Sequence, residues 1–186
     1  MNIAILASGA GSNAANIIAH FKNTSVNISL IACNKTNAGV FKIATENGIE
    51  SLLLTNENFK SSNDFINILK EKDIDLIILA GFLWLVPKNL VSAFEDKIIN
   101  IHPALLPKYG GKGMYGHFVH EAVCAACEKE SGITVHLVNE EFDKGAILFQ
   151  AKCNVENCTA QEIESKVRAL EIEHFPKVIE NFISKM

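Results

Sequence analysis

The sequence predicts an α/β fold built on a mostly parallel, doubly wound β-sheet. Short apolar runs alternate with segments whose apolar residues recur at helical spacing, along most of the 186 residues. Parallel strands need a crossover connection, usually a helix, and such crossovers are right-handed in nearly all proteins. The last two predicted strands are separated only by a short acidic loop, and they therefore form an antiparallel hairpin near the C-terminus. The N-terminal half is expected to be Rossmann-like.

Each element follows from a local pattern of apolar residues. Apolar runs predict strands at residues 3–6, 28–33, 52–54 and 76–80, and a further strand that ends at Ile101. Two later runs predict the strands of the hairpin, at residues 134–139 and 147–152. Helical spacing predicts helices at about 13–21, 38–47, 61–72, 88–94, 117–129 and 159–184. Strands and helices thus alternate before the hairpin, and a long helix follows it.

Length and composition indicate one domain, residues 1–186. The chain is 48% hydrophobic and 20% charged, as in ordinary compact proteins. Its net charge of −4 and its scattered basic residues argue against a nucleic-acid partner. The longest apolar stretch, residues 76–86, is shorter than the ~20 residues that span a bilayer. The short apolar run at the N-terminus has no basic flank, so we expect no signal peptide, no membrane partner and a cytoplasmic location.

The five cysteines indicate neither a disulfide framework nor a metal site. Cys124 and Cys127 have the spacing of a redox or metal motif, but they fall in a helical pattern among small residues. A second pair of cysteines or histidines, which would complete four metal ligands, does not follow. We therefore interpret these two residues as small buried residues of a helix, and we expect reduced thiols and no metal.

A glycine-rich turn at residues 8–13, Ser-Gly-Ala-Gly-Ser-Asn, follows the first strand and opens the first helix. Its glycines permit tight turns, and the exposed amides at a helix N-terminus form a site for an anion. The turn is not a dinucleotide fingerprint, because Ala14 stands at the third glycine position. The pattern favours a monophosphate ligand, while a plain turn with a helix cap is the alternative.

Asn100 and His102 stand two residues apart at the end of a strand, and Pro103 follows them at once. Side chains at this spacing point to the same face of a sheet. An amide donor beside a titratable ring suits a reaction in which a carbonyl oxygen gains charge while an amine loses a proton. The pair is therefore the leading candidate for catalysis.

Asp143 belongs to the acidic loop at residues 140–145 that joins the two hairpin strands. A carboxylate near an imidazole raises the pKa of the ring and holds its charged form. Acidic turns are more often solvated surface. This loop nevertheless carries the carboxylates that are best placed, at a strand end, to face Asn100 and His102.

Three other features have an open interpretation. Residues 79–86 leave a strand with an apolar wall and one Trp, which suits a flat aromatic ligand but also ordinary core packing. His136 lies on an alternating strand, where a structural histidine and a ligand contact are about equally expected. The glycine-rich segment at residues 110–116 is either a mobile substrate loop or a loose connection.

With these motifs, the chain resembles the folate-dependent phosphoribosylglycinamide formyltransferases. The match extends along essentially the whole chain. It rests on Ser-Gly-x-Gly-Ser-Asn at residues 8–13, Ala-Gly-Phe at 80–82, Asn-Ile-His-Pro-x-Leu-Leu-Pro at 100–107, Gly-x-Thr-Val-His at 132–136 and Asp-x-Gly at 143–145. The resemblance implies the formyltransferase fold, with phosphate and substrate bound by residues 1–100 and with catalysis and folate binding in residues 101–186.

The resemblance also implies roles for individual residues. The catalytic group would be Asn100, His102 and Asp143, and Glu171 would contact the substrate. The phosphate of the substrate would be held by Gly11, Ser12 and Asn13. The pterin of 10-formyltetrahydrofolate would be enclosed, largely through backbone groups, by Phe82, Leu83, Trp84, Leu85, Val86, Glu140 and Glu141.

The implied reaction moves a formyl group from 10-formyltetrahydrofolate, a co-substrate, to the amine of glycinamide ribonucleotide in de novo purine biosynthesis. Asn100 would donate to the oxyanion, and a cationic His102 paired with Asp143 would take part in proton transfer. No metal is implied, and the partners are small molecules, with a monomer or homodimer expected. The alternatives are a formyltetrahydrofolate hydrolase, a formyltransferase for another amine, or a non-catalytic nucleotide- or folate-binding module.

Overall fold

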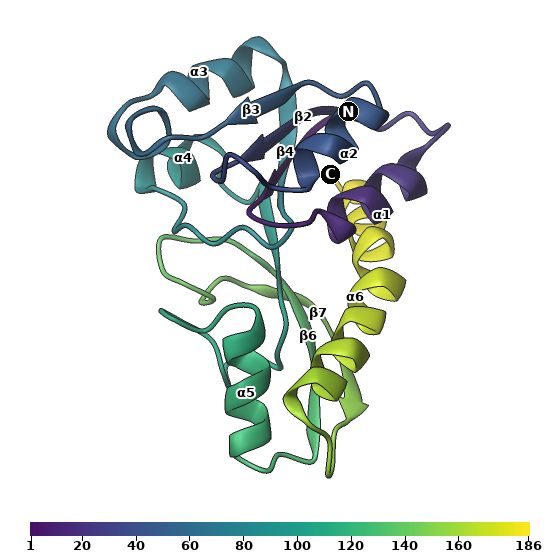
Figure 1. Cartoon of the computed structure of the whole chain (residues 1–186). Helices are drawn as coiled ribbons and strands as arrows, with labels where there is room; N and C mark the ends of the chain where they lie inside the picture. The colour runs from purple at the N-terminus through teal and green to yellow at the C-terminus, as the bar shows by residue number, and fades with distance from the viewer. The chain divides into compact units, whose positions relative to one another are not determined.

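The structure is a computed structural model that describes residues 1–186 apart from the side chain of Ser61. It contains two compact units, Met1–Ile99 and Asn100–Met186 (Figure 1). Strand β5 (Ile98–His102) begins in the first unit and ends in the second.

The first unit is a parallel sheet with helical crossovers. Its strands lie in the order β3-β2-β1-β4-β5, and β1 pairs in parallel with both β2 and β4. The bounds are β1 (Asn2–Ala7), α1 (Ser12–Phe21), β2 (Asn27–Cys33), α2 (Val40–Glu46), β3 (Ser51–Leu53), α3 (Asp64–Glu71), β4 (Ile74–Leu79) and α4 (Lys88–Ala93). The chain order reverses next to β1, as it does in a doubly wound sheet, and this confirms the predicted Rossmann-like half.

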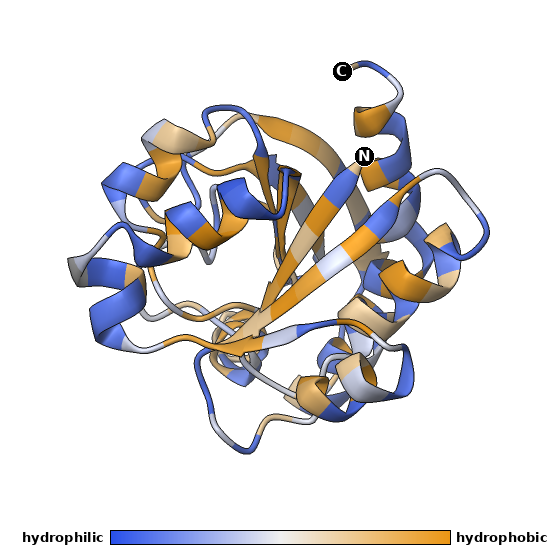
Figure 2. Cartoon of the chain, turned by 90° about the horizontal axis from the view of Figure 1, so that it is seen from above, coloured by the Kyte–Doolittle hydropathy of each residue, from blue (hydrophilic) through white to orange (hydrophobic). Residues whose placement is uncertain are grey.

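The core of the first unit explains why its strands carry continuous apolar runs. β1 is buried over Ile3–Ala7, and β4 is buried over Leu76–Leu79. Strands covered on both faces read as unbroken apolar stretches rather than as an alternation. Figure 2 shows the strands mostly in the hydrophobic colour, whereas the helices carry both hydrophobic and hydrophilic residues.

The second unit joins the end of β5 to an antiparallel hairpin and two helices. Its strands follow the order β5-β6-β7, with β6 (Glu130–Leu137) antiparallel to β7 (Ile147–Asn154). Helices α5 (His117–Ala125) and α6 (Ala160–Ile183) pack against each other, and α6 also packs on both hairpin strands. The antiparallel hairpin near the C-terminus is therefore confirmed.

Some predicted boundaries were wrong for local reasons. The helix predicted at 117–129 ends at Ala125, and Cys127 has a φ of 51° in the left-handed region. Cys127 is exposed and Cys124 is half-buried, so the interpretation of both as buried helix residues was wrong for Cys127. The helix predicted at 61–72 begins only at Asp64, after a π-helical turn at Glu57–Ser61.

Candidate active site

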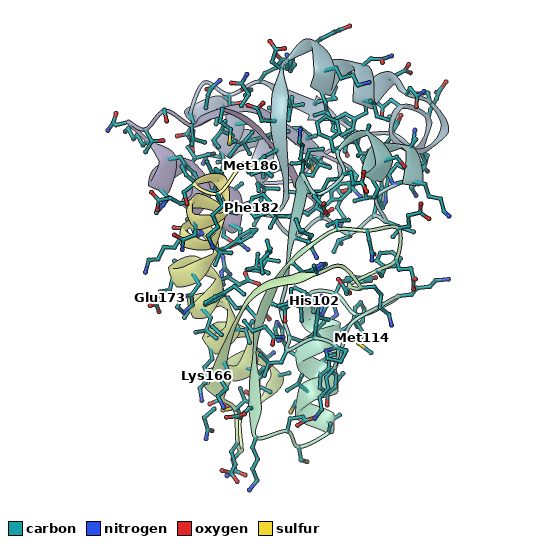
Figure 3. The ribbon with its side chains drawn as sticks, turned by 180° about the vertical axis from the view of Figure 1, so that it is seen from behind. His102, Met114, Lys166, Glu173, Phe182 and Met186 are labelled. Carbon is teal, nitrogen blue, oxygen red and sulfur yellow. The ribbon has the colours of Figure 1, made fainter. Side chains whose placement is uncertain are left out.

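The candidate active site of the second unit is built on the end of β5. Asn100 and His102 occupy alternate positions there, and the His102 side chain is buried while Asn100 is half-buried. In Figure 3, His102 lies next to α5 and the strands of the second unit. Alternate positions of a strand share one face, so the predicted common orientation of the two side chains follows from the strand itself.

The loop after β5 is fixed by one buried threonine. The hydroxyl of Thr134 on β6 donates to the carbonyl of Ala104 at 2.6 Å and accepts from the amide of Leu106 at 3.0 Å. The amide group of Gln150 on β7 donates to the same hydroxyl at 2.8 Å. Because this hydroxyl carries three bonds, the loop that follows His102 is held against the hairpin.

His102 lies between a backbone carbonyl and a carboxylate. Its Nε2 donates to the carbonyl oxygen of Tyr109 at 2.7 Å, because a carbonyl can only accept. Its Nδ1 lies 3.6 Å from Oδ2 of Asp143. The neutral ring therefore carries its proton on Nε2 and presents the lone pair of Nδ1 on the side of the carboxylate.

Burial decides the charge of His102. Removal from water lowers the pKa of the ring below 6.5, although Asp143 and the bond to Tyr109 both act to raise it, and His136 also lowers it. The lowered pKa favours a neutral ring near pH 7 in the free protein, whereas the cationic His102 was expected for the ring paired with Asp143 in the reaction. The neutral form is the one that can accept a proton.

Asp143 is held by two contacts besides His102. The amide of Gly111 donates to its Oδ2 at 2.8 Å, and its Oδ1 lies 3.5 Å from Nε2 of His136. Burial acts to raise the pKa of Asp143, but the side chains of His136 and His102 and the amide of Gly111 act in the opposite direction, and the net effect lowers that pKa. Asp143 is therefore ionised at neutral pH.

His136 is the site residue whose contacts the sequence did not resolve. Its Nδ1 donates to the carbonyl of Leu137 at 2.7 Å, so in the neutral ring Nε2 accepts from the side-chain amide of Asn100 at 3.0 Å. The ring is 2% exposed. One signal was available: Thr134 and His136 are polar residues on one face of the strand and alternate with the apolar residues Ile133, Val135 and Leu137, and buried polar groups need partners.

The predicted phosphate turn lies in the first unit, between β1 and α1. Gly11 caps α1 with a φ of 85°, and a Cβ there would lie 2.9 Å from the Cα of Val40, so the position requires glycine. Ser12 and Asn13 open the helix, which has no acidic residue in its first turn. The turn also borders an open hollow of about 670 Å³, lined by Ser8, Gly9, Ala10 and residues 34–39.

The segment after β4, predicted to enclose a pterin, is partly core. The side chains of Phe82 and Val86 are buried, whereas Leu83 and Trp84 are half-buried and Leu85 is exposed. The ring of Phe59 contacts the rings of both Phe82 and Trp84, at centroid distances of 5.3 and 5.8 Å. Phe82 and Val86 could therefore contact a ligand only through their backbone atoms.

The remaining predicted site residues lie in the second unit. Glu140 and Glu141 are exposed on the loop between β6 and β7, and Glu171 is half-buried on α6. The backbone amide of Glu141 donates to the side chain of Asn139 at 3.0 Å.

Two further properties concern the part of the chain that the structure describes. Over that part of the chain, no helix combines the length and apolar character needed to cross a bilayer. In the same residues, no three or more His, Cys, Asp or Glu side chains are grouped in a way that could hold a metal ion.

Comparison with known proteins gives a consistent result. A family model described as formyl transferase matches residues 1–179. The chain is 40% identical over 173 residues to a protein of Arabidopsis thaliana named phosphoribosylglycinamide formyltransferase, chloroplastic, with 89% of this chain covered. It spans 59% of the length of that plant protein and 59% of a second plant relative.

Bacterial relatives match over more of their own length. The phosphoribosylglycinamide formyltransferase of Bacillus subtilis is 34% identical over 187 residues, which cover 97% of this chain and 93% of that protein. The crystal structure of phosphoribosylglycinamide formyltransferase from Bacillus halodurans aligns with a TM-score of 0.89 at 32% identity, and covers 100% of this chain and 96% of that one.

Proposed function

Because the chain belongs to the formyl transferase family, we propose that it transfers a formyl group from 10-formyltetrahydrofolate to the amine of glycinamide ribonucleotide, in de novo purine biosynthesis. One observation carries the chemical part of this proposal. A neutral, buried His102 presents Nδ1 toward an ionised Asp143, and Nε2 of His136 lies 3.0 Å from the Asn100 amide and 3.5 Å from the same carboxylate. A proton acceptor, its counter-charge and an uncharged donor therefore belong to one network.

The proposed reaction begins with attack of the substrate amine on the formyl carbon. The new C–N bond forms, and the formyl oxygen becomes an oxyanion. The side-chain amide of Asn100 has two N–H groups: one is directed to His136, and we assign the other to the oxyanion. Oxyanion donors act strongly because they are fixed before the reaction starts.

His102 then transfers the proton from the attacking amine to the leaving nitrogen. Nδ1 accepts the proton lost by the attacking amine, either directly or through one water, and the imidazolium is stabilised by Asp143 on that side and by the Tyr109 carbonyl at Nε2. The same proton passes to N10 of the folate as the C–N10 bond breaks. Formyl glycinamide ribonucleotide and tetrahydrofolate are the products, and the step requires no metal ion.

The binding roles are proposals of the same kind. We assign the substrate phosphate to the turn that opens α1, with Gly11, Ser12 and Asn13 as donors, because a helix N-terminus favours an anion. We assign Glu171 to the substrate. The folate is assigned to the segment after β4 and the loop before β7, at Phe82, Leu83, Trp84, Leu85, Val86, Glu140 and Glu141.

We further propose that both units act together as one formyltransferase domain, residues 1–186. The chain would work in the cytoplasm with small-molecule partners only, as a monomer or a homodimer. The plant relatives are named chloroplastic. We do not assign their compartment to this chain, and the proposed cytoplasmic location requires its own test.

An assay with the purified chain tests the function. 10-Formyltetrahydrofolate is supplied with and without glycinamide ribonucleotide, tetrahydrofolate release is followed by absorbance, and the ribonucleotide product is weighed by mass spectrometry. We expect release only when the ribonucleotide is present, together with a formylated product. Release without the ribonucleotide would indicate a hydrolase, and no release in either case would indicate a binding module; both results contradict the proposal.

A further inference from the structure

Outside the residues assigned to catalysis, one carboxylate of the second unit holds the backbone that contacts His102. Oε1 of Glu128, in the connection between α5 and β6, accepts from the ammonium of Lys108 at 2.7 Å and from the hydroxyl of Tyr109 at 3.0 Å. The carbonyl oxygen of Tyr109 accepts from Nε2 of His102 at 2.7 Å. Glu128 is therefore connected to the imidazole ring through the side chain and the backbone of a single residue.

Tyr109 has a backbone conformation that needs support from its surroundings. Its φ is 55°, in the left-handed region that favours glycine. A residue with a side chain keeps such a conformation only where other contacts hold it. Glu128 supplies two contacts of this kind, one to Tyr109 itself and one to the preceding residue, Lys108. Glu128 thus restrains the residue whose carbonyl contacts His102.

The backbone that follows Tyr109 passes directly beside Asp143. A Cβ on Gly110 would lie 3.3 Å from the Cβ of Asp143, so the two residues approach each other closely. The next amide, that of Gly111, donates to Oδ2 of Asp143 at 2.8 Å. The same short segment therefore provides an acceptor for one of the proposed catalytic residues and a donor for another.

The two bonds to Glu128 differ in how well they can hold the backbone. The hydrogen bonds from Lys108 and Tyr109 lower the pKa of Glu128, so the carboxylate is ionised at neutral pH. The side chain of Lys108 is 68% exposed, and exposed ion pairs contribute little. Tyr109 is half-buried, and its rigid ring connects the hydroxyl to the backbone. The bond from the tyrosine is therefore the one that restrains the carbonyl.

Two acceptors compete for the single ring proton of a neutral His102. The Tyr109 carbonyl lies 2.7 Å from Nε2, and Oδ2 of Asp143 lies 3.6 Å from Nδ1. The tautomer of a histidine is set by the hydrogen bonds that its nitrogens make. If the carbonyl moves away, the proton shifts to Nδ1 and is donated to Asp143. Nδ1 then no longer accepts a proton from the substrate amine.

We propose that Glu128 is a positioning residue for formyl transfer, because it holds the Tyr109 carbonyl that keeps the proton of His102 on Nε2. Without Glu128, the ring stays beside Asp143 but adopts the tautomer that cannot take up the amine proton at Nδ1. This role rests on the function proposed above, whereas the tautomer itself is measured without any substrate.

The test uses nitrogen NMR of the full chain, labelled at histidine, at pH 8, where the His102 ring is neutral. The ring nitrogen shifts report which nitrogen carries the proton, and the His102 signals are identified by their loss in His102→Gln. We expect the proton on Nε2 in the unaltered chain, and a shift of about half of the population or more to Nδ1 in Glu128→Leu. A ring that keeps its proton on Nε2 in Glu128→Leu would overturn the proposal.

Three further variants isolate the bond from the tyrosine. Glu128→Gln keeps an oxygen that accepts from Tyr109 and should retain the tautomer. Tyr109→Phe removes only the hydroxyl and should shift the proton as Glu128→Leu does, although Lys108 stays paired with Glu128. Glu130→Leu is the matched control, because Glu130 likewise accepts from a lysine, Lys152, at 2.8 Å. A lost tautomer in Glu128→Gln, a retained one in Tyr109→Phe, or an equal shift in the control contradicts the proposal.

The formyl transfer assay gives the second readout, with circular dichroism to verify folding. In Glu128→Leu, kcat should fall about ten-fold, while KM for glycinamide ribonucleotide should stay within about two-fold, because proton transfer is affected and binding is not. Glu128→Gln should retain most of kcat. A raised KM with unchanged kcat would overturn the positioning role. An inactive unaltered chain would refute the proposed function instead, and the tautomer measurement would still decide whether Glu128 holds the ring proton of His102.

Discussion

At the scale of single residues, the protonation of His102 determines what the candidate site can do. A buried ring with Nε2 bonded to a carbonyl can use only Nδ1 for proton transfer, and Nδ1 is the atom on the side of Asp143. Asp143 acts to raise the pKa of His102, while burial has the larger and opposite effect. The charge of Asp143 therefore affects the pH at which the His102 ring becomes protonated.

Replacing Asp143 by Asn tests this relation. The amide has the size of the carboxylate but no charge, so the pKa of His102 should fall further and the imidazolium should lose its counter-charge. We expect kcat to fall by on the order of 10²-fold or more. We also expect the acidic limb of kcat/KM against pH to move to lower pH.

The control is Glu121→Gln, which removes an exposed carboxylate from α5 and should leave the profile unchanged. A limb that moves to higher pH in Asp143→Asn, or that does not move at all, would show that Asp143 does not set the charge of His102.

At the scale of elements, the hairpin of β6 and β7 holds the loop that follows His102. Thr134 is fully buried, and its hydroxyl bonds the carbonyl of Ala104, the amide of Leu106 and the side chain of Gln150. Thr134→Val keeps the shape and leaves these groups unpaired. We expect a loss of about 2–4 kcal/mol in the free energy of unfolding, measured with urea.

Thr45→Val serves as the comparison, because its exposed hydroxyl bonds only a carbonyl of its own helix, Phe41, and the change should stay within about 0.5 kcal/mol. Equal effects of the two substitutions would mean that the network around Thr134 contributes nothing to stability.

The same hairpin requires glycine at one position. A Cβ on Gly132 would lie 2.0 Å from the carbonyl oxygen of Ala151 and 2.9 Å from the Cα of Lys152, which are backbone atoms that cannot turn aside. Gly132→Ala should therefore lower the free energy of unfolding by about 2–4 kcal/mol. Gly9→Ala, where a Cβ meets nothing within 4 Å, should have little effect on stability. A tolerated Gly132→Ala would show that β6 and β7 can separate locally.

The elements also show where sequence patterns fail. β6 was predicted to start at Thr134, but it starts at Glu130. Glu and Gly have low strand propensity, so residues 130–133 gave a weak local signal. Their pairing with Ala151–Asn154 across the hairpin makes them a strand. That pairing depends on contacts about twenty residues away along the chain.

In the candidate site, the sequence predicted the relative placement of Asn100 and His102, because it depends only on the strand that carries both residues. Asn100 and His102 share a face because a strand alternates. Asp143 was named as a candidate, and the structure places it 3.6 Å from His102. The roles of Tyr109 and Gly111 had no sequence signal, because they act through a carbonyl and an amide that every residue possesses. The neutral state of His102 depends on burial, which local spacing does not determine.

At the scale of the whole molecule, buried histidines make stability depend on pH. Burial lowers the pKa of both His102 and His120 below 6.5. For His120, Glu164 acts in the opposite direction, while His102 and His117 lower its pKa further. As the pH falls below 6.5, the unfolded chain binds protons that the folded chain does not, so stability decreases. The contribution of Asp143, whose pKa is also lowered, is lost only below pH 3.8.

We therefore expect the free energy of unfolding to fall between pH 7.5 and pH 5, by up to about 1.4 kcal/mol per pH unit for each histidine. His120→Gln should reduce this slope, and the exposed His117→Gln should change it little. Urea unfolding at four pH values measures the slopes. Stability that rises on acidification over this range would contradict the lowered pKa values.

The central claim is that Asn100, His102 and Asp143 act as one unit in formyl transfer. The most direct measurement is kcat/KM for glycinamide ribonucleotide in Asn100→Ala, His102→Ala and Asp143→Ala, with circular dichroism to verify folding and Asn181→Ala as an exposed control. The account predicts that each of the three loses activity by on the order of 10²–10³-fold, while the control keeps it. Two of the three variants with near-full activity would contradict it.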